Sequence, residues 1–550
     1  MQTADTTCVP GVRPRKQNRI AADGALPRSQ SRTRTLAPET AEVLFERYGP
    51  RYRVFVTIVA LLGTVSAVLT TTTVNVALPD IMGSFGIGQD QAQWLSTGAL
   101  AAMTVGQLLS AWLMDSFGQR KTFVGALCVF VAALLIAGAS PNESVLIGTR
   151  VVQGLIAGVL QSLTMFTLFS VFPPERRGLA MGFFSINVIL GPAVGPTLGG
   201  ILIEHFNWRY VFYMALPFSI AGILFGMLFM PEREETTKRA DFDWIGFLLL
   251  SVTMSSLLTG LSNGQREGWS SDFVVGLLTL AAATGTGFIA WELHVAQPLV
   301  NLKVLATGQF AAAACVACVF GMGLFGTTYL IPLFVQTVQG FTPLDAGLLL
   351  MPGALLLGLF MPFGGYLSDR LPPRALIMTG LACFAAATWW MGGVDANTSY
   401  FGMLMCVVVS RAGQSLINPT LNATALRSLH SKQLRQGAGM INFSRQLGGA
   451  FGVNLLSVAL DRRSFFYSDV FTSLQTASNS ATAQLLDSVK RLLAQAGAPP
   501  DLQSAGALHF LGRVVYAQAY TMAFRDCFLL VALVFMLALI PAWIMGKKVR

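Results

Sequence analysis

Residues 191–200 read Gly-Pro-Ala-Val-Gly-Pro-Thr-Leu-Gly-Gly and lie in an apolar block that runs from about 178 to 203. Glycines recur at every fourth position, so they share one helix face: Gly191, Gly195 and Gly199, with Gly200 next to the last. A glycine face lets a second helix approach closely. Pro192 and Pro196 each remove a backbone donor and bend the helix. We interpret the run as a membrane helix in tight contact with a neighbour.

The apolar blocks on either side of this run indicate a membrane protein. Of 550 residues, 53% are hydrophobic and 12% are charged, about half the charged share of a soluble protein. Soluble cores stop growing near about 250–300 residues, so one core cannot bury this much apolar surface. The apolar residues fall into fourteen blocks, each about as long as the roughly twenty residues that span a bilayer. We therefore expect an all-α polytopic membrane protein with about fourteen transmembrane helices.

Basic residues predict the orientation of these helices. Lys and Arg gather in every second connection, the pattern of loops that stay in the cytoplasm. An even number of helices then places both termini in the cytoplasm. Residues 1–52 are polar and Arg-rich, without the apolar core of a signal peptide. We expect 1–52 to be a disordered basic cytoplasmic tail, and 546–550 to be a second short tail.

An internal repeat predicts two halves. The turn Leu-Met-Asp at 113–115 recurs as Leu-Ser-Asp at 367–369, and the Arg150–Gln153 spacing recurs at Arg411–Gln414. Transporters are often built from such repeats. We expect one six-helix half at 53–230, two inserted transmembrane helices in 231–300, and a second six-helix half at 301–545. An external loop should cover 461–520, with an amphipathic helix near 485–493 that ends before Pro499 and Pro500.

With these features the chain resembles the major facilitator superfamily over about 50–545, specifically its fourteen-helix drug:proton antiporter branch, the EmrB/QacA type. The 191–200 run matches the gxxxGPxxGG signature of exporters in this superfamily at every fixed position. The resemblance implies that the fifth helix contributes a gate, formed by Gly191, Pro192, Gly195, Pro196, Gly199 and Gly200. Ordinary tight packing is the alternative.

A second resemblance lies in the loop 111–121, which is similar to a family motif whose carboxylate and basic residues form a charge latch on the cytoplasmic side. Asp115, Gly118 and Arg120 fit that motif, whereas Ala111 and Ser116 depart from it. The copy at 365–370 is cleaner and supplies Asp369 and Arg370. Both copies imply gating residues, and the alternative is that these are solvated loop charges.

Two further patterns concern polar residues inside the helices. Arg150-x-x-Gln153-Gly154 resembles the fourth-helix motif of the family, whose arginine is thought to assist proton transfer. An arginine within a membrane helix costs about 2.5–3.5 kcal/mol, so it should face the interior; satisfaction by backbone carbonyls is the alternative. Residues 72–79 resemble the first-helix signature, but Thr70 stands where that signature has an acidic residue.

The blocks carry no Asp or Glu near their middle, so we expect a pathway lined by amides, hydroxyls and arginines. The residues predicted for the substrate and proton pathway are Thr70, Thr71, Asn75, Arg150, Gln153, Asn187, Asn418, Asn442 and Arg445. Because this lining is positively biased, we expect neutral or weakly acidic substrates to be preferred over organic cations. A bland alternative is that the arginines bind carbonyls and set no selectivity.

Catalytic and cofactor chemistry have no support in the sequence. The four histidines lack a second ligand at metal spacing, and no phosphate-binding Walker loop is present. Cys315 and Cys318 form a CxxC inside an Ala-rich block, where we expect them to pack as small residues. We therefore expect no catalytic residue, no metal and no cofactor, and we do not expect an enzyme.

Together these patterns predict a secondary active exporter of amphiphilic small molecules, of the multidrug-efflux kind. It would work by alternating access and proton-coupled antiport in the cell inner membrane. An importer or uniporter on the same fold is one alternative, and a non-transporting membrane receptor is another. The expected partners are an amphiphilic substrate and membrane lipid. A periplasmic membrane-fusion adaptor, with its outer-membrane channel, is expected to dock on 461–520; no nucleic-acid partner is expected.

Overall fold

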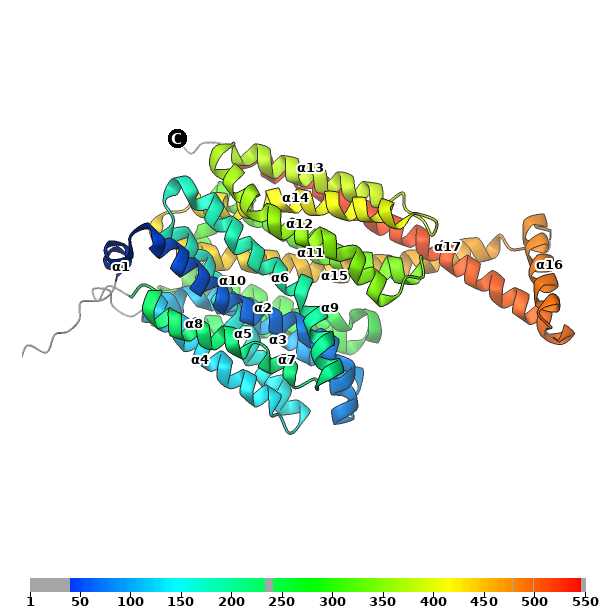
Figure 1. Cartoon of the computed structure of the whole chain (residues 1–550), viewed down its shortest axis with the longest axis horizontal. Coiled ribbons are helices and arrows are strands. Elements are labelled where there is room, and N and C mark those ends of the chain that lie inside the picture. The colour runs from blue at the N-terminus through cyan, green and yellow to red at the C-terminus, as the bar shows by residue number, and fades with distance from the viewer. Residues whose placement is uncertain (1–39, 233–240, 477, 498, 546–550) are drawn as a thin grey trace, which may run out of the picture. The chain divides into compact units, whose positions relative to one another are not determined.

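Helices build all the regular structure of the described part of the chain, which contains no strand (Figure 1). The computed structural model describes residues 40–232, 241–476, 478–497 and 499–545. Side chains at 89–90, 188–193, 196–197 and 343–344 lie outside this description. The described residues belong to one structural unit, Pro38–Arg550.

The first set of helices begins with a short helix and continues as long apolar helices that pack on one another. Their bounds are α1 Ala41–Tyr48, α2 Tyr52–Phe85, α3 Gln89–Phe117, α4 Gln119–Gly138, α5 Glu143–Val171, α6 Arg177–His205, α7 Tyr210–Tyr213 and α8 Leu216–Phe229. Helix α2 packs against α6 and α8, and α5 packs against α3 and α4. Short 3-10 turns at Gly49–Arg51 and Pro174–Arg176 precede α2 and α6.

The second set of long helices repeats these pairings. The bounds are α11 Gly308–Thr337, α12 Pro343–Arg370, α13 Pro373–Met391, α14 Tyr400–Arg427, α15 Leu434–Ser473, α17 Pro500–Leu537 and α18 Leu539–Ile544. Helix α11 packs on α15 as α2 packs on α6, and α14 packs on α12 and α13 as α5 packs on α3 and α4. The 3-10 turns Leu302–Ala306 and Ser431–Gln433 precede α11 and α15. This shared packing pattern is the one expected of two similar six-helix halves, which the sequence repeat predicts.

Two helices stand between the sets in sequence, α9 Trp244–Glu267 and α10 Asp272–His294. They pack along each other as a pair, and α9 also contacts α3 of the first set and α15 of the second. The inserted pair is therefore attached to both sets through α9.

Membrane spans account for nearly all of these helices. Twelve described helical segments are long and apolar enough to cross a bilayer. Helix α6, whose side chains are partly outside the description, and the arginine-bearing α15 are not among the twelve. Both nevertheless lie within the bundle, α6 against α2 and α12 and α15 against α11 and α3. With these two, the bundle has the fourteen helices expected from the sequence.

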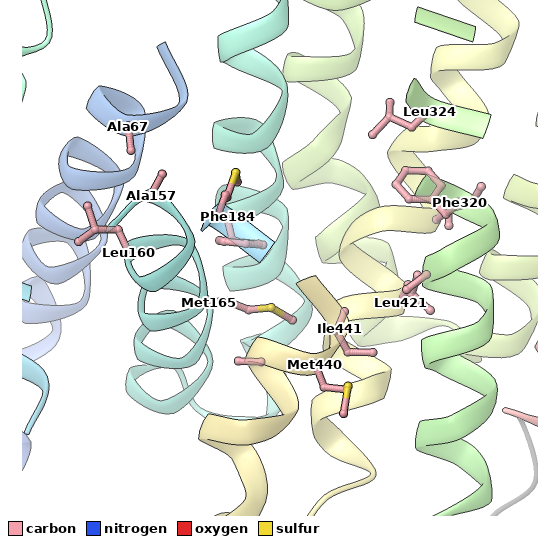
Figure 2. Close-up of a cluster of buried hydrophobic side chains, with 14 of the residues drawn as sticks. Ala67, Ala157, Leu160, Met165, Phe184, Phe320, Leu324, Leu421, Met440 and Ile441 are labelled. Carbon is pink, nitrogen blue, oxygen red and sulfur yellow. The ribbon is translucent and has the colours of Figure 1, made fainter. Parts of the chain in front are cut away.

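Buried apolar side chains hold the bundle together where the two sets meet. Figure 2 shows Met165 on α5 pointing toward the end of α15 that carries Met440 and Ile441. Met165 and Ile441 are fully buried, and Met440 nearly so. Methionine fills irregular gaps because its side chain is flexible and polarisable.

Two sequence expectations about irregular segments need correction. The predicted external loop 461–520 is helical over most of its length: α15 continues to Ser473, α16 spans Ser480–Gln495 and α17 starts at Pro500. The apolar block ends near 460, but residues 461–473 contain no Gly or Pro that would interrupt helix α15. The amphipathic helix and the break at Pro499–Pro500 are confirmed.

Part of the predicted disordered tail is also ordered. Residues 41–48 form α1, in which Leu44 is fully buried against Tyr52, Val56 and Val171. The apolar residues of this short stretch form a helical face that the charged residues around it conceal in the sequence. Residues 1–39 and 546–550 lie outside the described residues.

Candidate functional site

The glycine face of α6 meets the threonines of α2. A Cβ added at Gly195 would collide with the Thr72 hydroxyl, and one added at Gly199 would lie 2.5 Å from Thr73 Cγ2. A Cβ at Gly200 would meet nothing within 4 Å. Two of the predicted gate glycines therefore form the α2–α6 contact, whereas Gly200 lies off it. The side chains at Gly191, Pro192 and Pro196 are outside the described residues.

A charge contact joins α12 to both sets of helices. Arg427 Nη2, at the end of α14, lies 2.6 Å from Asp369 Oδ1. The same carboxylate accepts hydrogen bonds from the backbone N–H of Gly178 at 2.7 Å and of Leu179 at 3.0 Å. These amides start α6, where a helix favours a negative charge. Asp369 therefore ties the second set of helices to the first.

A second charge contact joins the sets through other helices. Arg435 Nη1, at the start of α15, pairs with Asp115 Oδ1, near the end of α3. Both side chains are half-exposed, and exposed pairs contribute only about 0–1 kcal/mol. We call the side of the bundle that holds Asp115, Asp369, Arg427 and Arg435 the latch side.

The basic residues next to the two aspartates in sequence have other partners. Arg120 Nη1 lies 2.9 Å from Glu232 Oε1, and its Nε donates to the Met230 carbonyl at 2.7 Å. Arg370 stacks over the Tyr366 ring at 4.4 Å. Gly118 joins α3 to α4 with a φ of 82°, a left-handed value that glycine tolerates best. Sequence reasoning therefore found the latch aspartates and the turn, but missed Arg427 and Arg435 as their partners.

Backbone-to-backbone contact also closes the bundle on the latch side. A Cβ at Gly365 on α12 would collide with the Gly178 carbonyl on α6, and a Cβ at Gly439 on α15 would collide with the Gln107 carbonyl on α3. Glycines thus allow the two sets to touch there, and the described conformation is sealed on the latch side.

The arginine–glutamine pairs of the sequence repeat have the same geometry in both sets. Arg150 Nη1 donates to Gln153 Oε1 at 3.0 Å, and Arg411 Nη1 donates to Gln414 Oε1 at 3.0 Å. Arg150 Nε also donates to the Leu95 carbonyl at 3.1 Å. Arg150 is only 1% exposed, yet its Nη2 has no hydrogen-bond partner. Arg150 therefore uses Nε to bind α3 and Nη1 to bind Gln153 of its own helix. Its Nη2 can donate to another group.

A polar network occupies the buried centre of the second set. Arg445 Nη2 donates to Asn442 Oδ1 at 2.5 Å, and Asn422 donates to Asn418 Oδ1 at 3.1 Å. Asn442 Nδ2 also lies 3.4 Å from the Met165 sulfur on α5. Asn418 Nδ2 and Asn422 Oδ1 have no hydrogen-bond partner. Unpaired buried polar atoms are costly, and this cluster holds both an unpaired donor and an unpaired acceptor. Asn422 was not among the predicted residues.

The predicted residues of the first set are less closely grouped. The hydroxyls of Thr70 and Thr71 donate to carbonyls one turn back in α2, at 2.8 and 2.9 Å. Asn75 is exposed and accepts from Ser96 Oγ at 2.7 Å. Asn187 is buried, with its Oδ1 unpartnered. Asn75 and Asn187 thus have free polar capacity, whereas the two threonine donors are bound within their own helix.

Helix α11 carries the CxxC pattern of Cys315 and Cys318. Cys315 and Cys318 are free thiols. Among the described residues, no group of three His, Cys, Asp or Glu side chains could hold a metal ion.

Comparison with known proteins gives consistent relatives. Residues 60–453 match the family profile described as Major Facilitator Superfamily. The Multidrug resistance protein B homolog of Mycobacterium tuberculosis is 30% identical over 73% of this chain and 75% of its own. The Multidrug export protein EmrB of Escherichia coli is 28% identical over 78% of this chain and 85% of its own. An uncharacterized MFS-type transporter of Bacillus subtilis, YhcA, is 30% identical over 86% and 89%.

Solved structures share the fold. The human organic anion transporter MFSD10 (TETRAN) aligns with a TM-score of 0.53, covering 88% of this chain and 99% of its own, at 16% identity. The proton:xylose symporter XylE aligns with a TM-score of 0.53 at 15% identity. At this identity the likeness concerns the fold alone.

Proposed function

This chain belongs to the major facilitator superfamily, and from that premise we propose that it is a secondary active exporter of amphiphilic small molecules, of the multidrug type. It works by alternating access and by antiport with protons. The observation that carries the proposal is a pair of charge contacts that join the two sets of helices on one side: Asp115 with Arg435, and the Asp369 carboxylate, itself paired with Arg427, with the amides that start α6. Breaking both contacts would let the sets separate there and admit a substrate.

The latch side is cytoplasmic in this proposal, because the basic connections cluster with it. The chain then spans the inner membrane with both termini in the cytoplasm, and the described conformation is the one closed toward the cytoplasm. Export would begin when the Asp369 carboxylate loses its hold on the amides that start α6. Relatives named for multidrug export support this direction of transport.

The substrate in this proposal binds near the bilayer midplane at the polar cluster of Asn418, Asn422, Asn442 and Arg445. Its unpaired amide atoms offer both a donor and an acceptor, and Asn442 reaches α5 of the other set through Met165. Arg150, Gln153 and Asn187 contribute the opposite wall. Because the charged members are arginines, neutral or weakly acidic amphiphiles fit this lining better than organic cations.

Residues 461–520, which we call the docking arm, are proposed to bind a periplasmic membrane-fusion adaptor. That adaptor would itself be joined to an outer-membrane channel. Helix α16 packs on α17 and carries an amphipathic sequence. Large apolar side chains of this segment are exposed, among them Phe465, Leu474, Leu492, Leu502 and Leu508. Exposed apolar patches rimmed by polar residues often bind proteins.

Flux in inverted membrane vesicles tests the proposed function. With a pH gradient acid inside, a lipophilic weak-acid dye should accumulate in vesicles containing the protein, and an uncoupler should abolish the accumulation. Accumulation in right-side-out vesicles instead would indicate an importer. Flux that ignores the gradient would indicate a uniporter, and no flux by purified protein in liposomes would favour a receptor.

A further inference from the structure

Two acidic residues at one end of the inserted helix pair are buried without the basic partner that the nearly buried Asp369 has. Asp243, which precedes α9, is 9% exposed, and Glu292, in the last turn of α10, is 4% exposed. No Lys or Arg of the described chain forms an ion pair with either of them. Two adjacent buried carboxylates without a cation are costly if both are ionised.

The two carboxyl groups face each other across Gly246. A Cβ added at Gly246 would collide with Asp243 Oδ2 and would lie 2.9 Å from Glu292 Oε1. Both oxygens therefore border the same small space, which only a glycine leaves open. Glu292 Oε1 has no hydrogen-bond partner, although the residue is buried. An unpaired buried oxygen next to an anion needs a proton.

The hydrogen bonds indicate which group carries that proton. Asp243 Oδ1 accepts from the Gly246 N–H at 2.8 Å and from Trp291 Nε1 at 2.9 Å, and it caps the positive end of α9. Asp243 Oδ1 therefore already has two donors in its place as the cap of α9. Glu292 accepts a single hydrogen bond, from the Val300 N–H to Oε2 at 3.2 Å. A proton on Glu292 Oε1 can then be donated to the Asp243 carboxylate.

We propose that Asp243 and Glu292 form a proton-binding site in which one proton, held on Glu292, bridges the two carboxyl groups. The charged groups on the elements around the pair are exposed to solvent: Asp241, His294 and Lys303. On the α3 side the contact is aromatic, with Trp112 and Phe242 rings 4.5 Å apart. No other described titratable group shares the site.

The helix that begins at this site, α9, contacts both sets through side chains near its other end. From α9, Ser262 Oγ accepts from Gln93 Nε2 of α3 at 2.6 Å, and Gln265 Nε2 donates to Asp461 of α15 at 2.7 Å. Loss of the bridging proton would place two anions together, loosen the 295–300 segment from the start of α9, and disturb a helix that touches both sets. This consequence rests on the proposed function, since the transport pathway itself lacks a carboxylate that could titrate.

Infrared spectroscopy of the full-length protein in lipid vesicles tests the site without requiring transport. The carbonyl band of a protonated carboxyl group should be present at neutral pH and should disappear on alkaline titration. In Glu292→Gln that band should be lost, whereas the matched control Glu267→Gln, an exposed carboxylate at the other end of α9, should keep it. A Glu292→Gln spectrum identical to the unmodified one would overturn the proposal.

A second variant tests the coupling between the two groups. Asn caps helices about as well as Asp, so Asp243→Asn should fold while removing the neighbouring charge. The band should then titrate at lower pH, by about one unit or more. An unchanged titration would overturn the shared-proton arrangement. If vesicle flux is absent in every variant while the band behaves as expected, the proposed transport function fails and the proton site stands.

Discussion

Arg427 Nη2 and Asp369 Oδ1 lie 2.6 Å apart although 58 positions separate them in sequence, and the carboxylate also accepts from the Gly178 and Leu179 amides in the first turn of α6 at 2.7 and 3.0 Å. The aspartate side chain is only 7% exposed. Charge-assisted hydrogen bonds to a nearly buried carboxylate contribute about 1.5–3 kcal/mol each. This one side chain therefore holds α12, α14 and α6 together, and in the proposed transport cycle its release lets the two sets of helices separate on the latch side.

The first prediction uses that contact. Arg427→Gln and Asp369→Asn should each weaken the closed latch side by roughly tenfold or more in its closing equilibrium. A reporter cysteine at Ser110, fully buried on α3, should then react faster with a membrane-impermeant thiol reagent added from the cytoplasmic side. Arg370→Gln is the matched control, because Arg370 stacks on Tyr366 and does not contact Asp369. Equal reactivity in Arg427→Gln and Arg370→Gln would show that the pair does not hold the latch.

The comparison of Arg427 with Arg370 also shows what sequence could predict at the latch. Both aspartates stand in recognisable turns, so their positions could be predicted locally. Their partners come from distant helix ends, with Arg435 lying 320 positions from Asp115. Only the packing of α12 on α6 and of α15 on α3 brings these groups together, and no local pattern specifies it.

The second prediction concerns the glycine face of α6. Gly195→Leu and Gly199→Leu should block transport, because each side chain would push α6 away from Thr72 or Thr73 of α2. Overpacking of this kind costs about 1–3 kcal/mol. Gly200→Leu is the control: a Cβ there meets nothing within 4 Å, so its flux should stay near normal. Expression and detergent-solution monodispersity should be measured for all three.

The outcome would separate a gate from ordinary packing. A loss of folded protein in Gly195→Leu and Gly199→Leu would favour packing alone, and normal flux in both would remove the α2–α6 contact from the transport cycle. The sequence predicted this face correctly at Gly195 and Gly199, because four-residue spacing fixes a helix face. It included Gly200 because the exporter signature contains that glycine, although the next residue of a helix is turned about 100° away from the face.

Continuity of helices was the other feature that sequence could not settle. Apolar composition ends near 460, but α15 continues to Ser473, because Arg463 and Tyr467 of the extension bind Asp526 of α17 and no Gly or Pro interrupts the helix. The carboxyl pair of Asp243 and Glu292 was also missed, since both residues lie at helix ends, where acidic residues are ordinarily solvated. The signal available was the Asp-x-x-Gly pattern at the start of α9.

The third prediction concerns the docking arm. Replacing 474–499 with a short Gly/Ser linker removes α16 and leaves α15 and α17 at their full lengths. Drug resistance in cells should fall to the level of the empty vector, whereas flux in proteoliposomes should remain within about twofold. Leu492→Ser and Leu502→Ser together, which change only exposed side chains, should give a weaker version of the same split. Cellular resistance that survives the replacement would rule out a docking role.

The last prediction concerns substrate charge. Arg150, Arg411 and Arg445 are buried in the two sets, whereas the buried or nearly buried carboxylates of the described chain, Asp243, Glu292 and Asp369, all lie at helix ends. A cation about 8 Å from one uncompensated arginine meets a repulsion of about 2 kcal/mol at an effective dielectric constant near 20. We therefore expect efflux of a lipophilic weak acid to exceed that of a matched lipophilic cation by at least about tenfold. Strong cation export by the unmodified protein would refute this.

Thr70→Asp supplies the missing charge at the position where an acidic residue stands in the resembling exporters. Thr70 is 1% exposed and its hydroxyl donates to the Ser66 carbonyl at 2.8 Å, so the new carboxylate would be buried and would attract a cation strongly. Preference should shift toward the cation in Thr70→Asp and should not shift in Thr70→Asn, which has the same shape without the charge. If both variants shift alike, shape at Thr70 governs selectivity. If neither shifts, Thr70 lies away from the substrate, because a buried anion on the pathway could not leave cation binding unchanged.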